Sequence, residues 1–339
     1  MKQNLLATAA AALMLQGVAG VAFADELNLY TTREPKLVEP LLQAFTEGSG
    51  IEVNTIFLKD GMPERVEQEG DASPADVLMT VDIGNLVDLV DRGLTQPVDS
   101  EVLAEAIPEN LRDKDGNWFA LSLRARALYA AKDLDLTSFT YEDLAKPEWK
   151  GKVCIRSGQH PYNVALTASY ITHHGAEDTK AWLQGVKDNL ARKAGGGDRD
   201  VARDILGGIC DIGIANTYYI GVMRSGAGGP EQEEWADAVK VILPTFEGGG
   251  TQVNVTGAAV AKHAPNKDNA VKLLEYLVSD DAQKIYAEAN FEYPVKPGIA
   301  VDPLVGDFGE LTVDSTDLTA IARERKTASE LAEEVGFDN

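Results

Sequence analysis

The chain has 339 residues, and its 54 acidic against 31 basic residues give a formal net charge of −23. This excess repels nucleic acid and anionic membranes, which argues against a nucleic-acid partner and against membrane binding through basic residues. Because the acidic residues are spread along the chain, a site for a small anion would need its own local arginines or lysines.

The first 24 residues have the pattern of a secretory signal peptide. Lys2 precedes an apolar run over residues 5–22, and Ala22-Phe23-Ala24 forms a cleavage motif before Asp25. The alternative interpretation is an uncleaved transmembrane helix, which the glutamine and glycines inside the run disfavour. No cysteine stands at the cleavage point, so a lipid anchor is not expected. We therefore expect a periplasmic protein whose mature chain begins at Asp25.

Strand-like and helix-like segments alternate along the remaining chain. Residues 27–31 predict a strand, and residues 35–45 predict a helix with one apolar face, although Pro40 could delay its start. The further expected elements are strands over 51–57 and 75–80, a helix over 83–90, a strand-like segment over 121–126, a strand over 152–156, helices over 164–172, 180–190 and 200–206, strands over 209–215, 239–243 and 253–261, and helices over 266–278 and 316–335. This alternation predicts an α/β fold with mainly parallel sheets.

The mature length fits two lobes of ordinary size. No long linker separates two halves of the sequence, so we expect closely joined lobes with more than one chain crossing. Ligands of open α/β sheets bind beyond the carboxyl ends of strands. The loops that this rule favours follow Thr31, Thr80, Arg156 and Ala215.

Cys154 and Cys210 are the two cysteines of the chain. In an exported protein the simplest interpretation of such a pair is a disulfide bond. Closing a loop of this length would stabilise the fold by roughly 4 kcal/mol in the chain-entropy model.

Motifs of common enzyme classes are missing from the sequence. It contains no nucleophile elbow, no P-loop and no zinc-protease H-E-x-x-H pattern. His173 and His174 are adjacent on an expected helix, where neighbouring side chains diverge by about 100°, so they make a poor chelating pair. The glycine runs at 195–197 and 248–250 favour turns or hinges. Nothing argues for an enzyme, although carboxylate catalysis leaves little trace in a sequence.

Tyrosines and arginines follow the expected strands in a pattern that suits a hard cation. Tyr218 and Tyr219 come after the strand over 209–215, and Tyr162 lies in the loop after the strand over 152–156. Each alone is more simply a core or surface residue. Together, as phenolates, they would offer Fe(III) three hard anionic oxygens. Arg33 and Arg124 could then hold a small anion such as carbonate beside the metal.

The chain resembles the ferric-ion-binding proteins of bacterial iron ABC importers over nearly its whole mature length. The segments that carry the resemblance are residues 29–35, 73–77, 121–126, 154–158, 210–219, 257–260 and 292–295. The paired tyrosines after the segment 210–217 are its most specific part. The resemblance implies a two-lobed type II periplasmic-binding-protein fold with a hinge, and delivery to an iron ABC permease with its ATPase.

The same resemblance implies site residues. It makes Tyr218 and Tyr219 ligands of Fe(III), with Tyr162 as the third ligand in the tyrosine-rich subgroup. Arg33 and Arg124 would hold a synergistic carbonate or bicarbonate. With this fold we expect a monomer whose lobe 1 comprises residues 25–122 and 249–302 and whose lobe 2 comprises residues 123–248 and 303–339.

Two positions depart from other ferric-binding subgroups. Glu34 stands where some relatives carry a histidine ligand, and Val81 stands where some carry a glutamate ligand. A protein ligand from lobe 1 is therefore not expected, and Asp82 could contribute only indirectly. Two alternatives stay open: a binding protein for a polyamine or an oxyanion on the same fold, and a secreted enzyme.

Overall fold

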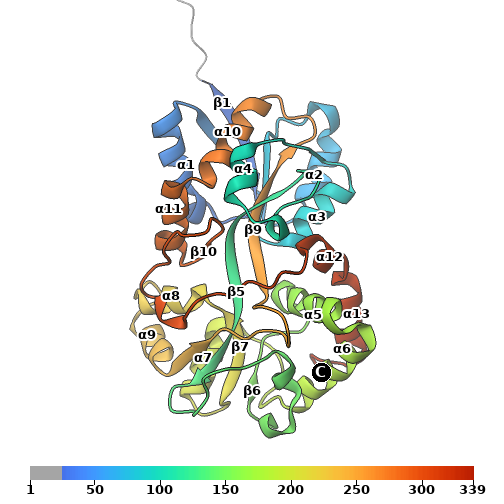
Figure 1. Ribbon diagram of the computed structural model, residues 1–339, viewed down its shortest axis with the longest axis vertical. Helices are drawn as coiled ribbons and strands as arrows, with labels where there is room; N and C mark the ends of the chain where they lie inside the picture. The colour runs from blue at the N-terminus through green and yellow to red at the C-terminus, as the bar shows by residue number, and fades with distance from the viewer. Residues whose placement is uncertain (1–24) are drawn as a thin grey trace, which may run out of the picture.

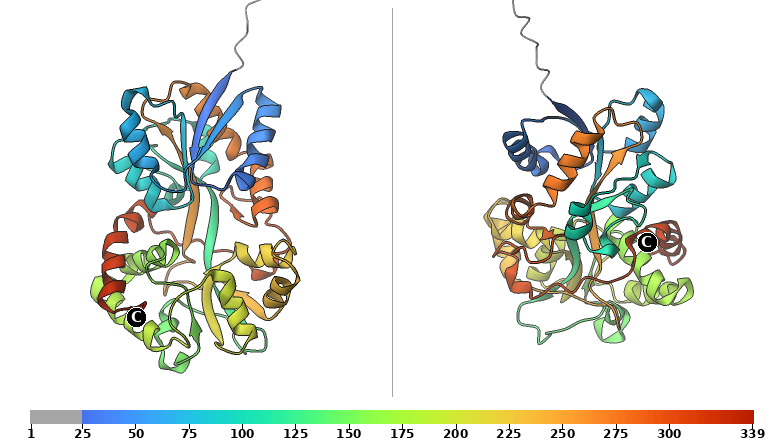
Figure 2. Two further views of the ribbon diagram at one scale, coloured as in Figure 1. Left: turned by 180° about the vertical axis from the view of Figure 1, so that it is seen from behind. Right: turned by 45° about the horizontal axis from the view of Figure 1, so that its top comes forward.

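The computed structural model describes residues 25–339, so the predicted signal peptide at residues 1–24 lies outside the described residues. The described chain forms two lobes, one above the other in Figure 1. Seen from behind, the green strand β5 (Phe119–Ala131) and the orange strand β9 (Val253–Ala261) run along the middle of the molecule (Figure 2). Among residues 25–339, no helix has both the length and the apolar composition needed to cross a membrane.

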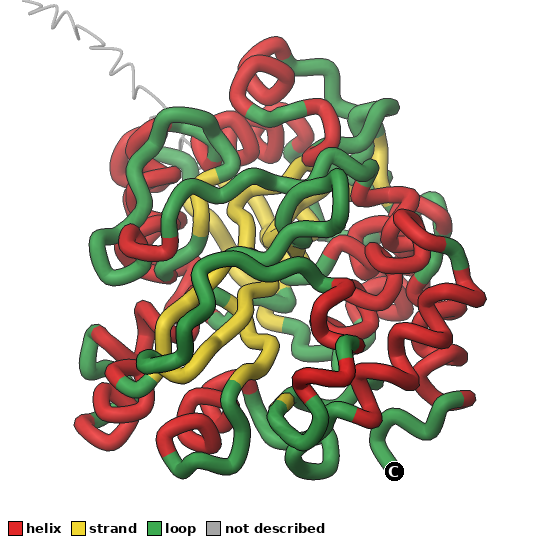
Figure 3. Tube along the Cα trace, turned by 60° about the horizontal axis from the view of Figure 1, so that its bottom comes forward, coloured by secondary structure: helices red, strands yellow, loops and turns green. Residues whose placement is uncertain are grey.

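Ten strands of the described chain form one extended sheet with the central order β2-β1-β3-β9-β5-β7-β6. Figure 3 shows these strands in the middle, with helices on either side. Besides β5 and β9, the strands are β1 (Glu26–Thr31), β2 (Glu52–Phe57), β3 (Val77–Thr80), β4 (Thr95–Gln96), β6 (Val153–Cys154), β7 (Ile212–Asn216), β8 (Val239–Ile242) and β10 (Tyr293–Pro294).

The expectation of mainly parallel sheets is wrong. β1 pairs in parallel with β2 and β3, and β6 pairs in parallel with β7. The pairs of β9 with β3 and β5, and of β5 with β7, β8 and β10, are antiparallel. The two long strands therefore make the sheet mixed, because β9 returns between β3 and β5 from late in the sequence.

β5 belongs to both lobes. Its first half pairs with β9 from Phe119 to Ala125, and its second half pairs with β7 from Arg126 to Ala130. The strand thus changes partners between Ala125 and Arg126. We propose the lobe boundaries expected from the sequence, with residues 25–122 and 249–302 in lobe 1 and residues 123–248 and 303–339 in lobe 2; the change of partners supports the first of these boundaries.

Helices cover both lobes. They are α1 (Pro35–Ser49), α2 (Met62–Glu69), α3 (Ile83–Asp91), α4 (Glu101–Ala106), α5 (Pro161–His174), α6 (Ala176–Asp188), α7 (Asp198–Leu206), α8 (Tyr218–Arg224), α9 (Pro230–Asp237), α10 (Lys267–Leu277), α11 (Asp280–Asn290), α12 (Leu318–Arg323) and α13 (Arg325–Glu334). The expected helix over 316–335 is thus two helices. Of these, α12 contacts α3 of lobe 1 and α5 of lobe 2.

Helix α1 shows how the sequence specifies such an element. It begins at Pro35, whose fixed backbone angle suits a first helical turn, and it continues regularly through Pro40. Its apolar residues Val38, Leu41 and Phe45 are buried on one face. The helix ends at Gly50, which adopts the left-handed conformation that closes many helices.

The predicted disulfide is confirmed. Cys154 at the end of β6 and Cys210 before β7 are bonded, with Cα atoms 5.9 Å apart. The strands are so close that a Cβ added to Gly213 would lie 2.3 Å from the carbonyl oxygen of Cys154. The bond therefore links the two strands that precede the Tyr162 loop and the Tyr218–Tyr219 pair.

Replacing both cysteines by alanine should lower the free energy of unfolding by roughly 4 kcal/mol, because the unfolded chain regains the freedom of a long loop. Urea unfolding of the oxidised protein and of the Cys154→Ala/Cys210→Ala variant measures the difference. Adding a thiol reductant should destabilise only the oxidised parent protein. Equal unfolding midpoints for the two proteins would contradict the prediction.

Candidate functional site

A pocket of about 500 Å³ lies between the lobes. Lobe 1 contributes Arg33 after β1 and Val81 after β3, and lobe 2 contributes Tyr162 and the tyrosines at the start of α8. Arg124 lies on β5 where the lobes join, and there it pairs with Asn254 of β9. The loops after β1, β3, β6 and β7 therefore meet in one place, as the carboxyl-end rule predicts. All five residues expected from the sequence to form the site line this pocket: Arg33, Arg124, Tyr162, Tyr218 and Tyr219.

The three phenols form one cluster. The hydroxyl oxygens of Tyr162 and Tyr218 are 3.4 Å apart, and the rings of Tyr218 and Tyr219 have centroids 4.1 Å apart. Tyr162 is in the first turn of α5, whereas Tyr218 and Tyr219 open α8, where adjacent side chains diverge by about 100°. Adjacent side chains of a regular strand would point to opposite faces, whereas at the start of α8 both long phenol side chains reach the lining of one pocket.

Burial and crowding keep Tyr218 and Tyr219 protonated. Burial raises the pKa of Tyr218 well above its ordinary value, and the neighbouring Tyr162 and Tyr219 raise it further. Burial also raises the pKa of Tyr219, with Tyr162 and Asp198 adding to the shift. Ionising either group at neutral pH therefore requires a strong positive charge in the pocket.

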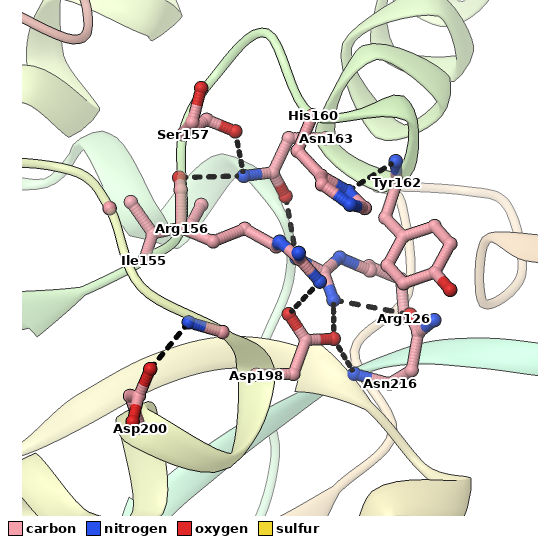
Figure 4. Close-up of polar contacts among 12 residues, drawn as sticks. Arg126, Ile155, Arg156, Ser157, His160, Tyr162, Asn163, Asp198, Asp200 and Asn216 are labelled. Atoms are coloured by element: carbon pink, nitrogen blue, oxygen red, sulfur yellow. Dashed lines mark hydrogen bonds and ion pairs between the residues drawn. The ribbon is translucent and has the colours of Figure 1, made fainter.

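A buried ion cluster lies beneath Tyr162 (Figure 4). Asp198 accepts hydrogen bonds from Nη1 of Arg126 at 2.6 Å and from Nη1 of Arg156 at 3.2 Å. The backbone N–H of Asn216, at the end of β7, donates to the same carboxylate at 2.8 Å. Both guanidinium groups lie over the Tyr162 ring, at 5.2 Å for Arg156 and 5.9 Å for Arg126. The cluster thus joins the strand that leads to α8 with the residues that support Tyr162.

Asp198→Asn should lower the free energy of unfolding by about 3–5 kcal/mol, because it leaves the buried guanidinium group of Arg126 and the half-buried one of Arg156 without their carboxylate. Urea unfolding followed by far-ultraviolet circular dichroism would measure this loss. Asp237→Asn is the matched control, since Asp237 is exposed at the end of α9. A loss no larger than that of the control would show that the ion cluster does not stabilise lobe 2.

His160 caps the helix that carries Tyr162. Its Nδ1 accepts a hydrogen bond from the backbone N–H of Tyr162 at 3.2 Å, and the two rings have centroids 4.5 Å apart. Burial and the nearby Arg156 lower the pKa of His160 to about 4. The imidazole is therefore neutral at physiological pH, and its Nδ1 is free to accept this bond.

The two arginines predicted for an anion both line the pocket, and both are almost fully buried. Arg33 donates through Nη1 to Glu292 at 2.7 Å and to Thr256 at 3.1 Å. Arg124 donates through Nη2 to the carbonyl oxygens of Val81 and Val255. Among the described residues, Nε of both arginines has no hydrogen-bond partner. Each guanidinium therefore keeps donor capacity beyond its contacts with the protein.

Comparison with known proteins places the chain among binding proteins. The family model described as bacterial extracellular solute-binding protein matches residues 30–284. The chain belongs to the bacterial extracellular solute-binding protein family. Iron uptake protein A2 of Synechocystis sp. is 42% identical over 317 residues, which cover 92% of this chain and 90% of the relative.

Solved structures agree with this family. A structure named Bordetella ferric binding protein is 65% identical, with a TM-score of 0.90 over 93% of this chain and 100% of the other. A Trichodesmium protein in complex with iron and citrate ligands is 40% identical, with a TM-score of 0.87 over 92% and 99% of the two chains. The expected two-lobed fold and the resemblance to ferric-ion-binding proteins are confirmed.

The two positions that depart from other subgroups, Glu34 and Val81, both line the pocket. Glu34 is exposed, and its carboxylate lies 3.3 Å from Nζ of Lys36. Val81 lines the pocket with an apolar side chain. Asp82 is buried and caps α3, and its carboxylate accepts a hydrogen bond from Asn254 of β9 at 2.7 Å. Asp82 is thus engaged in the junction between the lobes.

Three charged residues of the pocket were not expected from the sequence: Lys36, Arg199 and Glu292. Glu292, which follows α11, is buried between Arg33 and the hydroxyl of Ser122. Arg199 lies 5.3 Å from the centre of the Tyr219 ring. Glu292 stands in a segment that carries the family resemblance, but that segment does not reveal its burial. Arg199 follows a glycine run whose only sequence signal is a turn.

Proposed function

We propose that this solute-binding protein captures Fe(III) in the cleft between its lobes. Tyr162, Tyr218 and Tyr219 would bind the ion as phenolates, which are hard anionic oxygen donors suited to a hard trivalent cation. The observation that carries the proposal is the phenol cluster, with the hydroxyl oxygens of Tyr162 and Tyr218 3.4 Å apart and the Tyr219 ring against that of Tyr218.

The charges around the phenols support this assignment. Guanidinium groups lie over the rings of Tyr162 and Tyr219 and would stabilise the ionised phenols. The pocket lining does not suit a polyamine, which needs clustered carboxylates. It has four cationic side chains and two carboxylates: Arg33, Lys36, Arg124 and Arg199, and Glu34 and Glu292. Relatives named as an iron uptake protein and a ferric binding protein support the same cargo.

Arg33 and Arg124 would hold an anion that completes the coordination of the ion. Their unpaired Nε atoms and their place in the pocket lining fit this role. Carbonate or bicarbonate is the anion expected from the sequence. The pocket volume of about 500 Å³ also leaves room for a larger carboxylate, and the Trichodesmium relative holds iron with citrate.

The protein would act by binding rather than by turnover. As a monomeric extracellular solute-binding protein it would collect the ion in the periplasm and deliver it to an ABC permease that is powered by an ATPase. Release to the permease would follow the opening of the lobes, for which β5 and β9 provide the connection between them.

A visible absorption titration tests the proposal. Metal-free mature protein would receive Fe(III) from nitrilotriacetate, with bicarbonate, with citrate, or with neither anion. We expect a tyrosinate-to-iron charge-transfer band that saturates at one equivalent. A band that needs one of the anions would support the arginine-held anion and identify it. Absence of the band under all three conditions would overturn phenolate ligation.

A further inference from the structure

The loop that leads to Tyr162 is held from two sides. Residues 156–160 connect β6 with α5, and Asn163 of α5 donates through Nδ2 to the carbonyl oxygens of Arg156 and Ser157 at 2.9 and 3.0 Å. Figure 4 shows this contact beside Tyr162. The second hold comes from the segment that follows α13, about 180 residues later in the sequence.

Asp338 accepts two hydrogen bonds from this loop. The backbone N–H of Gly158 donates to Oδ1 at 2.7 Å, and the hydroxyl of Ser157 donates to Oδ2. Next to it, the buried ring of Phe337 covers Gly158 so closely that a Cβ added there would lie 2.8 Å from Cδ1 of the ring. Two donors on one carboxylate, with a ring against the adjacent glycine, fix the loop in position and orientation.

The segment that makes these contacts is itself anchored to lobe 2. The backbone N–H of Phe337 donates to Ala332 of α13 at 2.9 Å, and Nζ of Lys187 donates to the carbonyl oxygen of Val335 at 2.8 Å. Helix α13 packs against α5 and α6. The contacts of Asp338 and Phe337 with Ser157 and Gly158 together form a clamp. This clamp connects the loop before α5 with α13, which packs against α5.

We propose that Asp338 is a positioning residue for Tyr162, a role that rests on the proposed function. Ser157 and Gly158 precede the cap residue His160, and Tyr162 follows that cap directly. When the clamp is lost, the loop gains freedom at the point where α5 begins, and the phenol loses its fixed place opposite Tyr218. Metal ligands must be held within about 0.5 Å of productive geometry, and loss of a supporting contact typically costs 10–100-fold in affinity.

Asp338→Asn tests the role with almost no change in volume. We expect the dissociation constant for Fe(III), measured by competition with nitrilotriacetate, to rise about tenfold, the lower end of the range for supporting contacts. We also expect a weaker or shifted charge-transfer band. The matched control is Glu177→Gln, which removes one negative charge from exposed Glu177 in the first turn of α6, beyond the end of α5 that is opposite to Tyr162. It should bind as the parent does.

A double-mutant cycle separates positioning from general stability. In a Tyr162→Phe background the phenol is gone, so Asp338→Asn should have no further effect on affinity or on the band. An equal effect in both backgrounds would overturn the proposal, as would an unchanged dissociation constant in the single variant. If Asp338→Asn does not fold, Ser157→Ala removes one donor from the loop side, and the same cycle applies to it. A parent protein without any tyrosinate band would instead contradict the proposed function.

Discussion

Replacing Tyr218 by phenylalanine should weaken Fe(III) binding by at least about 100-fold. Loss of a contact that merely supports a metal ligand costs roughly 10–100-fold, and here the ligand itself is removed. Tyr218 is central to the cluster, because its hydroxyl lies 3.4 Å from that of Tyr162 and its ring lies against Tyr219. The aromatic ring remains in Tyr218→Phe, so the packing of α8 is preserved.

Competition with nitrilotriacetate would give the affinities of the parent and of the variant, and the charge-transfer band would report the number of bound phenolates. Tyr276→Phe is the control, because Tyr276 of α10 packs on Phe45 of α1 and is not part of the pocket lining. If Tyr218→Phe bound as tightly as Tyr276→Phe, Tyr218 would not be a ligand.

Lowering the pH should weaken Fe(III) binding by about 100-fold per pH unit, counting only the protons that Tyr218 and Tyr219 release. Burial and neighbouring groups raise the pKa of both phenols above the ordinary value near 10, so both are protonated in the metal-free protein at neutral pH. Binding as phenolates releases one proton from each. Protons therefore compete with the ion, and the apparent affinity falls by a factor of about ten per pH unit for each released proton.

Proton release can be counted directly. Ferric nitrilotriacetate added to weakly buffered protein with an indicator dye should release at least two protons per bound ion, after correction for the protein-free reaction. Tyr219→Phe should release one proton fewer than the parent. Equal proton release by both proteins, or an affinity that does not change between neutral and mildly acid pH, would contradict phenolate binding.

Short apolar segments next to turns were enough to predict much of the fold. The strand over 253–261 has the same bounds in the structure, and α1 begins at the predicted proline. β5 was recognised only in part, because Arg124 and Arg126 interrupt its apolar pattern although both are buried. The prediction of mainly parallel strands was wrong for a different reason. The return of β9 to a place between β3 and β5 is set by tertiary packing and has no local sequence signal.

The residues of the candidate site could be predicted where a suitable side chain directly follows an expected strand. The three phenols follow strands whose carboxyl ends meet, and paired tyrosines are uncommon enough to attract notice. Asp198 and Glu292 could not be found this way, since the chain has 54 acidic residues and no sequence signal shows that these two are buried beside the site. Asp338 is even harder to predict from the sequence, because its contact with the Tyr162 loop exists only after α13 has packed on α5.

The pairing of β9 also implies an order of folding. The lobe 2 strands β6, β7 and β8 and their partner β5 all lie between Phe119 and Ile242, and so do both bonded cysteines. In lobe 1, β3 pairs with β1 directly, but its connection to β5 runs through β9, where Val77 pairs with Val260. As chain segments become available from the N-terminal side, the phenol-bearing sheet can form from one continuous stretch. The sheet of lobe 1 must wait for β9, and the contacts of Asp338 with the Tyr162 loop must wait for the last residues of the chain. The phenol-bearing sheet is therefore a local folding unit, whereas the complete cleft needs the C-terminal part of the chain.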